Sequence, residues 1–146
     1  MIDPSLEFNL VTAFMAARNE RQQSVTVEHL LRTLLNNATV VEILRACGAN
    51  VEVLRERLSV FISENAVIVP GNKEVASAPT LGFERTIQRA FMYAQKTDGK
   101  QEVVTGARVL IAIFGEKDSH ATYLLHQQGL TRLDVHNYMS YGIKKG

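Results

Sequence analysis

Apolar residues in the first half of the chain recur at spacings of three and four, which is the period of an amphipathic helix. The pattern predicts helices at 4–21, from 27 to about 37, at 40–47 and from 51 to about 64. Residues suited to helix ends support these bounds. Asp3 opens the first helix, Thr26 the second and Asn50 the fourth, and Gly48 ends the third.

The helical pattern breaks between residues 65 and 79, where Pro70 and Pro79 bracket several turn-forming residues. We interpret this segment as a linker. Residues 67–69 form a short apolar run with the composition of a strand, but the sequence offers it no obvious pairing partner. An all-helical fold is therefore still favoured.

After Thr80 the helical period returns and repeats the order of the first half. The pattern predicts helices at 81–97, 106–115, 120–128 and 132–141, the last opened by a capping box from Thr131 to Asp134. Thr105 then corresponds to Thr26. The chain is predicted to be all-α, one domain over 1–146 made of two tandem pseudo-symmetric four-helix repeats, at 1–64 and 80–142, with the linker at 65–79.

Length, composition and charge narrow the class of protein. A chain of 146 residues with 46% hydrophobic content can bury a core without disulfides or metal. A net charge of +1 argues against electrostatic binding to nucleic acid or to an anionic membrane. Cys47 is the single cysteine, no apolar run approaches the ~18–20 residues of a membrane span, and the N-terminus does not resemble a signal peptide. We expect a cytoplasmic protein.

The sequence carries none of the common motifs of catalysis or cofactor binding. It has neither a G-x-x-x-x-G-K-[ST] loop nor a G-x-G-x-x-G turn, and Cys47 beside Gly48 suits packing. A helix-turn-helix at 129–131 fits the spacing, but Asp134 among few cations argues against DNA binding. We expect a non-catalytic domain with no cofactor and no metal site. The histidines are not spaced as metal ligands and are expected to be surface or partly buried: His29, His120, His126 and His136.

One asymmetry between the two halves points to a binding role. Glu28 follows Thr26, whereas Ala107 stands at the corresponding position after Thr105. Glu28 at a helix start can simply complement the helix dipole. However, a purely stabilising acid could have been kept in both halves, so we hypothesise that Glu28 contacts a partner. Alanine at this position is then expected to abolish binding and to change the melting temperature little.

Six residues starting at Thr26, T-V-E-H-L-L, resemble the T-x-E-H-[IL]-L signature of Clp amino-terminal repeat domains. The similarity continues through 79–85, 104–110 and 123–125 and ends with R-L-D-V at 132–135, so it covers essentially the whole chain. The sequence is most similar to ClpA-type members, rather than ClpB or ClpC types. This resemblance implies a mobile helical domain at the front of a hexameric ATPase that feeds the ClpP peptidase, with ATP bound by ATPase modules outside this sequence.

The resemblance also implies a partner and a set of contact residues. ClpA-type domains dock the adaptor ClpS, which delivers substrates with destabilising N-terminal residues. Their ClpS-facing positions are matched here by Glu28, Thr80, Arg85 and Arg132. A further acid of that surface is replaced by Gln23, so one charge-assisted contact is expected to be weaker or missing. ClpC-type domains bind phosphorylated arginine through a glutamate in each repeat, and Ala107 removes the second, so we expect no such site.

Two functions remain open on the sequence alone. The first is a monomeric docking domain that binds ClpS and passes protein substrates towards ClpP. The second is a direct receptor that binds unfolded polypeptide in an apolar groove between the repeats. Two of the candidate residues also have structural interpretations, since Thr80 can cap the following helix and Arg85 can pair with a nearby acid. An independent hydrolase is disfavoured.

Overall fold

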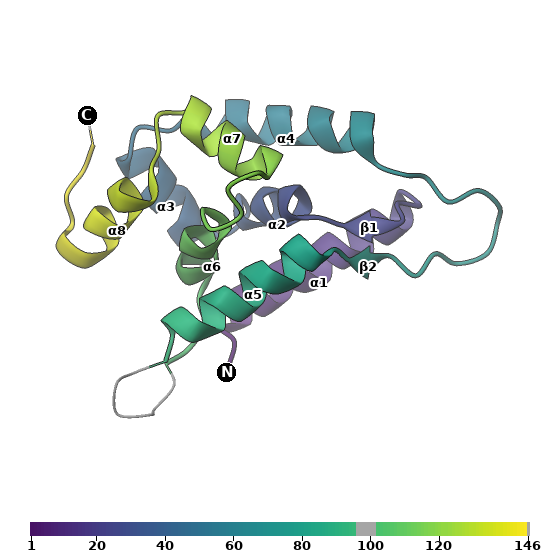
Figure 1. The fold of residues 1–146 in the computed structure, drawn as a ribbon, viewed down its shortest axis with the longest axis horizontal. Helices are drawn as coiled ribbons and strands as arrows, with labels where there is room; N and C mark the ends of the chain where they lie inside the picture. Colours follow the sequence, from purple (N-terminus) through teal and green to yellow (C-terminus); the bar gives the residue numbers. More distant parts are fainter. Residues whose placement is uncertain (96–101, 146) are drawn as a thin grey trace.

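The computed structural model describes residues 1–95 and 102–145, and within these ranges it contains eight helices and one two-stranded parallel sheet (Figure 1). No described helix is both long and apolar enough to cross a bilayer. The elements in chain order are α1 Pro4–Asn19, β1 Ser24–Val25, α2 Val27–Leu34, α3 Ala38–Ala46, α4 Val51–Asn65, β2 Ala78–Pro79, α5 Leu81–Tyr93, α6 Gly106–Ile113, α7 His120–Gln127 and α8 Arg132–Tyr141.

The predicted helical fold is confirmed, and the helices differ from the prediction only in where they begin and end. Helix α1 ends at Asn19 rather than at 21, because Arg21 takes a left-handed backbone conformation with φ of 57°. Helix α3 begins two residues early, because the Asn37 side chain accepts hydrogen bonds from the N–H groups of Thr39 and Val40. Helix α5 ends at Tyr93, and the expected end at 97 lies outside the described residues.

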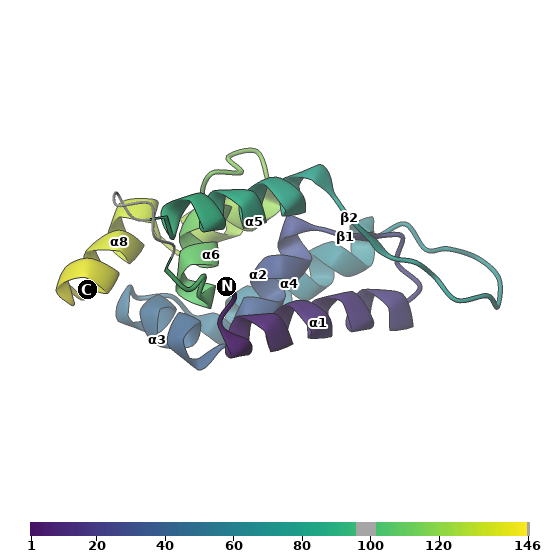
Figure 2. The ribbon, with the colours of Figure 1, turned by 90° about the horizontal axis from the view of Figure 1, so that it is seen from below.

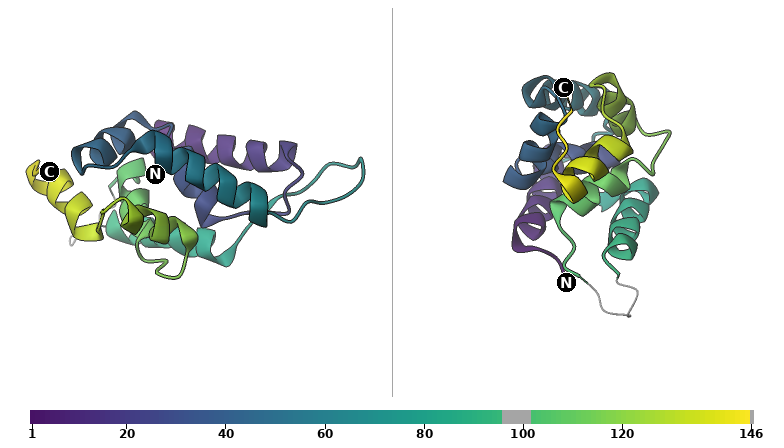
Figure 3. Two further views of the ribbon diagram at one scale, coloured as in Figure 1. Left: turned by 90° about the horizontal axis from the view of Figure 1, so that it is seen from above. Right: turned by 90° about the vertical axis from the view of Figure 1, so that its left-hand side faces the viewer.

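The helices are arranged around a central pair, α2 and α6. Figures 1 and 2 show α4 and α7 on one side of this pair, and α1 and α5 along the two edges of the other side. Helices α3 and α8 form one end of the molecule (Figure 3). The centre is apolar, and its fully buried side chains include Leu30, Leu31 and Leu34 of α2 and Leu110 and Ile113 of α6. One continuous cluster of buried residues draws on both halves of the sequence.

Two short parallel pairings relate the halves to each other. The residues before α2 pair with those before α5, as Ser24–Val25 with Ala78–Pro79. In the same way Ile2, before α1, pairs with Val104, before α6. In each pairing, the residues before a helix of the first half lie beside the residues before a helix of the second half. The two pairings are related in the way that the sequence repeat predicts.

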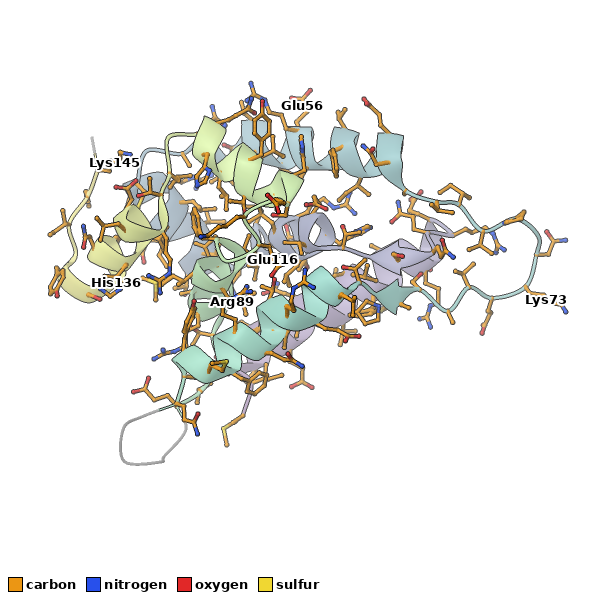
Figure 4. All side chains as sticks on the ribbon, viewed as in Figure 1. Glu56, Lys73, Arg89, Glu116, His136 and Lys145 are labelled. Atoms are coloured by element: carbon orange, nitrogen blue, oxygen red, sulfur yellow. The ribbon has the colours of Figure 1, made fainter. Side chains whose placement is uncertain are left out.

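The segment between α4 and β2 extends away from the helices as a long loop, with Lys73 near its tip (Figures 1 and 4). Arg21 fixes this loop through its guanidinium group, which donates to the carbonyl groups of Val69, Pro70 and Lys73. Ile68 also forms an antiparallel bridge with Gln22. The apolar run at 67–69 therefore does have a pairing partner, which the sequence did not reveal because it lies in the turn after α1.

Candidate functional site

Three helix N-termini converge on one open cavity of about 670 Å³. They belong to α2, α5 and α7, and their capping residues Thr26, Thr80 and Ser119 all line the cavity. Each cap oxygen accepts a backbone N–H three residues on, at 3.1 to 3.3 Å. Free N–H groups and aligned peptide dipoles make such a place attractive to acidic groups.

The T-V-E-H string forms the first turn of α2, and His29 completes a capping box with Thr26. Its Nδ1 accepts the Thr26 N–H at 3.0 Å, so Nε2, 2.6 Å from the Gln22 Oε1, is the nitrogen that donates. Burial, with a smaller contribution from the Arg32 charge, lowers the pKa of His29 to about 4. The expectation of a surface or partly buried histidine is wrong for His29, which is only 3% exposed.

Glu28 is buried, and its carboxylate faces a different helix from its own. The Oε2 atom accepts the backbone N–H of Ala121 at 2.9 Å, in the first turn of α7. It thus satisfies one of the N–H groups that a helix start leaves without a partner. This contact corrects the interpretation that Glu28 complements the dipole of α2 alone, and it gives the residue a structural role beside any role in binding.

The corresponding place in the other half explains why Ala107 needs no carboxylate. There the start of α3 is capped by the buried side chain of Asn37, whose amide also donates to Asn9 Oδ1 at 3.0 Å. Gly106 makes room for this amide, since a Cβ there would lie 2.7 Å from Asn37 Nδ2. The asymmetry between Glu28 and Ala107 therefore has a packing cause.

A cluster of two arginines and one glutamate forms another wall of the cavity. Arg85 donates to both carboxylate oxygens of Glu116, at 2.7 and 3.3 Å, and Arg89 donates to Oε2 at 2.9 Å. Figure 4 shows Arg89 and Glu116 near one another at the centre of the molecule. The hydrogen bond from Arg85, with help from Arg89, holds the pKa of Glu116 below its usual range. The Arg85 side chain is still 57% exposed, against 9% for Glu116.

Three of the five predicted contact residues come together in this cavity: Glu28, Thr80 and Arg85. Gln23 does not line it. Its side chain is exposed, and its backbone pairs with Val67 and Ala78. Arg132 does not line it either, since its guanidinium lies 5.4 Å from the centre of the Tyr93 ring, at the start of α8.

The sequence reasoning missed three residues of the same wall, Arg89, Glu116 and Ser119. A signal was present for Ser119, which stands at a helix start. None was present for Glu116, which lies in the turn after α6 and depends on partners 27 and 31 residues away.

Charged side chains of both signs line the cavity. The acids of its lining are Glu28, Glu116 and Asp118, and the cations are Arg85, Arg89 and Lys117. In the described part of the chain no three potential ligands are grouped so as to hold a metal. Cys47 is buried elsewhere, its Sγ donates to the Asp134 carbonyl at 3.6 Å, and burial raises its thiol pKa, as a packing role requires.

The structure is that of a small helical domain with one open cavity of mixed charge at three helix starts. A family model described as the Clp repeat (R) N-terminal domain matches residues 1–128. The chain belongs to this family, whose members are small non-catalytic domains of AAA+ proteins.

Individual relatives agree with this assignment. A ClpA homologue of Fuscovulum blasticum is 36% identical over 142 residues, which cover 97% of this chain and 18% of that protein. This chain therefore spans about a fifth of the relative's length. A ClpV N-domain in complex with a VipB peptide has a TM-score of 0.71 at 18% identity, over 96% of this chain and 85% of that one. The Hsp104 N-terminal domain of Candida albicans has a TM-score of 0.74 at 10% identity, over 92% and 85%. The two structures show a shared fold.

Proposed function

We propose that this domain docks the adaptor ClpS and so delivers protein substrates to an ATP-dependent unfoldase that works with the ClpP peptidase. The observation that carries the proposal is the meeting of Glu28, Thr80 and Arg85 in one cavity, although they come from three separate motifs of the sequence. The similarity to a ClpA homologue supports this choice of partner. In the same proposal the full-length protein is cytoplasmic, and ATP binds outside this domain.

The chemistry of the cavity suits a partner that presents both charged and polar groups. Arg85 is held by Glu116 yet largely exposed, so it can exchange part of that ion pair for an acidic group of the adaptor at small cost. Glu28 and the caps of α2, α5 and α7 offer fixed acceptors and donors that do not need to be ordered on binding. Gln23 and Arg132 lie outside the cavity and are proposed to contact a wider adaptor footprint.

Isothermal titration of the domain with purified ClpS tests the proposal. We expect one-to-one binding that is at least tenfold weaker for Arg85→Ala, because a charge-assisted contact contributes about 1.5–3 kcal/mol. Arg45→Ala is the matched control, since Arg45 is an exposed arginine that pairs with Glu52 outside the cavity. Normal ClpS binding by Arg85→Ala would remove Arg85 from the site, and no binding by the unaltered domain would refute the proposal.

A direct receptor for unfolded polypeptide is the second candidate. A groove of about 620 Å³ lies between α4 and α7, one helix from each half, and exposes apolar parts of Val60, Phe61 and Tyr123. The fold neighbour ClpV binds a peptide, which supports this possibility. Binding of reduced, carboxymethylated lactalbumin that is lost in Tyr123→Ser, and is displaced by short hydrophobic peptides, would favour this function. Unchanged binding by Tyr123→Ser would exclude the groove.

A further inference from the structure

A second, smaller cavity lies where α1, α2 and α4 meet, and it shares no lining residue with the cavity of the predicted ClpS contacts. Its volume is about 290 Å³. Small residues of α1, Ala13 and Ala16, form part of its wall, and two arginines, Arg32 of α2 and Arg55 of α4, line it. No aspartate or glutamate is among its lining residues.

Arg32 is a half-buried cation without a direct partner. Its side chain makes no hydrogen bond and no ion pair with any residue in 1–95 or 102–145. Burial lowers the pKa of its guanidinium, and the charge of Glu20, at the end of α1, opposes this effect only in part. An unpaired guanidinium removed from water is unfavourable, so this position gains from an anion.

Arg55 is held in place by the end of α2. It donates to the Asn36 side chain and to the Leu35 carbonyl, both at 3.0 Å. These two bonds fix the plane of its guanidinium and cover a carbonyl that would otherwise repel an anion. The pKa of Glu52 is held low mainly by its own backbone and by Arg45, with a smaller contribution from Arg55, and Glu52 does not line the cavity.

Ser59 of α4 adds an uncommitted donor. Its hydroxyl has no hydrogen-bond partner among the described residues, whereas the other two hydroxyls of the cavity are occupied: Thr12 donates to the Phe8 carbonyl and Thr33 to the Asn9 carbonyl. His29 also lines the cavity, but it is neutral near pH 7 and adds no charge. The open donors of the cavity therefore include those of Arg32, the remaining N–H groups of Arg55, the Asn36 amide nitrogen and the Ser59 hydroxyl.

We propose that this cavity is a binding site for a small oxyanion, with Arg32 as its main ligand and with Arg55 and Ser59 completing the donor set. Guanidinium groups bind carboxylate and phosphate oxygens in the same geometry. The oxyanion has two possible sources, free phosphate or a carboxylate of a bound polypeptide. This site is independent of ClpS docking.

An NMR titration at constant ionic strength tests the site with two probes, inorganic phosphate and acetyl-glutamate amide. We expect saturable shifts of the backbone amides of Thr12, Arg32 and Ser59 with at least one probe, and the probe that saturates identifies the source. Arg32→Gln should weaken binding at least tenfold, because it removes a charge-assisted hydrogen bond. Arg18→Gln, an equal loss of charge at an exposed position of α1 outside the cavity, should bind within about twofold of the unaltered domain.

Saturation by neither probe, or equal affinity of Arg32→Gln and the unaltered domain, would overturn the proposal. If Arg32→Gln does not fold, Ser59→Ala replaces it, and an unchanged affinity of that variant together with shifts spread over the whole surface would also overturn it. A thermal scan adds an independent readout, since binding to the native state alone raises the melting temperature. Phosphate also stabilises proteins non-specifically, so the rise must be smaller in Arg32→Gln than in Arg18→Gln.

Discussion

The carboxylate of Glu28 lies 2.9 Å from the backbone nitrogen of Ala121, and this contact joins the first turn of α2 to the first turn of α7 across 93 positions of sequence. Both groups are buried. A residue that the sequence marks as a partner contact is therefore also part of the internal structure. The expectation that its removal leaves stability nearly unchanged no longer follows.

Glu28→Ala should destabilise the domain by about 1–3 kcal/mol, because it leaves the buried Ala121 N–H without an acceptor. Glu28→Gln keeps an acceptor oxygen near the Ala121 N–H and should lose clearly less stability than Glu28→Ala. Urea denaturation of both variants measures the difference. Equal stability of Glu28→Ala and the unaltered domain would show that water replaces the carboxylate at no cost.

His29 should make stability depend on pH between 6.5 and 4. Burial depresses its pKa to about 4 in the folded state, so the unfolded chain takes up the proton first as the pH falls. The free energy of unfolding therefore carries no cost from His29 above pH 6.5. It falls progressively between pH 6.5 and about pH 4, by about 3 kcal/mol in total. Denaturation midpoints across this range should depend less steeply on pH in His29→Gln than in the unaltered domain.

Glu116 should affect the stability of the domain at lower pH than His29 does. Arg85 and Arg89 depress its pKa, so its contribution is complete above its ordinary value of about 4.3 and is lost as the pH falls through the depressed value. Glu116→Gln should therefore be less stable than the unaltered domain at pH 6, and the two curves should converge in acid. Parallel curves down to pH 2.5 would contradict this assignment.

Gly106→Ala should destabilise the domain by about 1–3 kcal/mol, although alanine favours helices, because the new Cβ would crowd the Asn37 amide. The loss should shrink when Asn37 is also replaced by alanine. A thermodynamic cycle of the two substitutions measures this coupling, and strictly additive losses would indicate that α6 shifts to accommodate the methyl group.

The helices and their caps were predictable because their causes are local. Asp3, Thr26, Asn50, Thr80 and Thr131 cap helices as their sequence positions indicate. One local signal was overlooked: a histidine three residues after a threonine cap stands in the second position of a capping box, and this placement accounts for the buried His29.

The walls of the site could not be predicted in the same way. Glu116 becomes a site residue only because α5 packs beside α6 and brings Arg85 and Arg89 to it. The cavity at Arg32 likewise depends on how three helices meet. Periodicity gives the buried face of each helix but not the neighbour that it meets, so charges that pair between helices stay hidden in a single sequence.

Two parallel pairings join the halves of the domain, Ile2 with Val104 and Ser24–Val25 with Ala78–Pro79. The halves therefore pack against each other much as two subunits of a dimer do. The two ends are built from corresponding helices of the two halves, but their side chains differ. At one end Asn9 and Asn37 fill the space between helix starts. At the other end Glu28, Arg85 and Arg89 line an open cavity. A repeated helical unit can therefore be closed by packed amides at one end and keep an open, charged cavity at the other, and this open end is where the proposed docking of ClpS would take place.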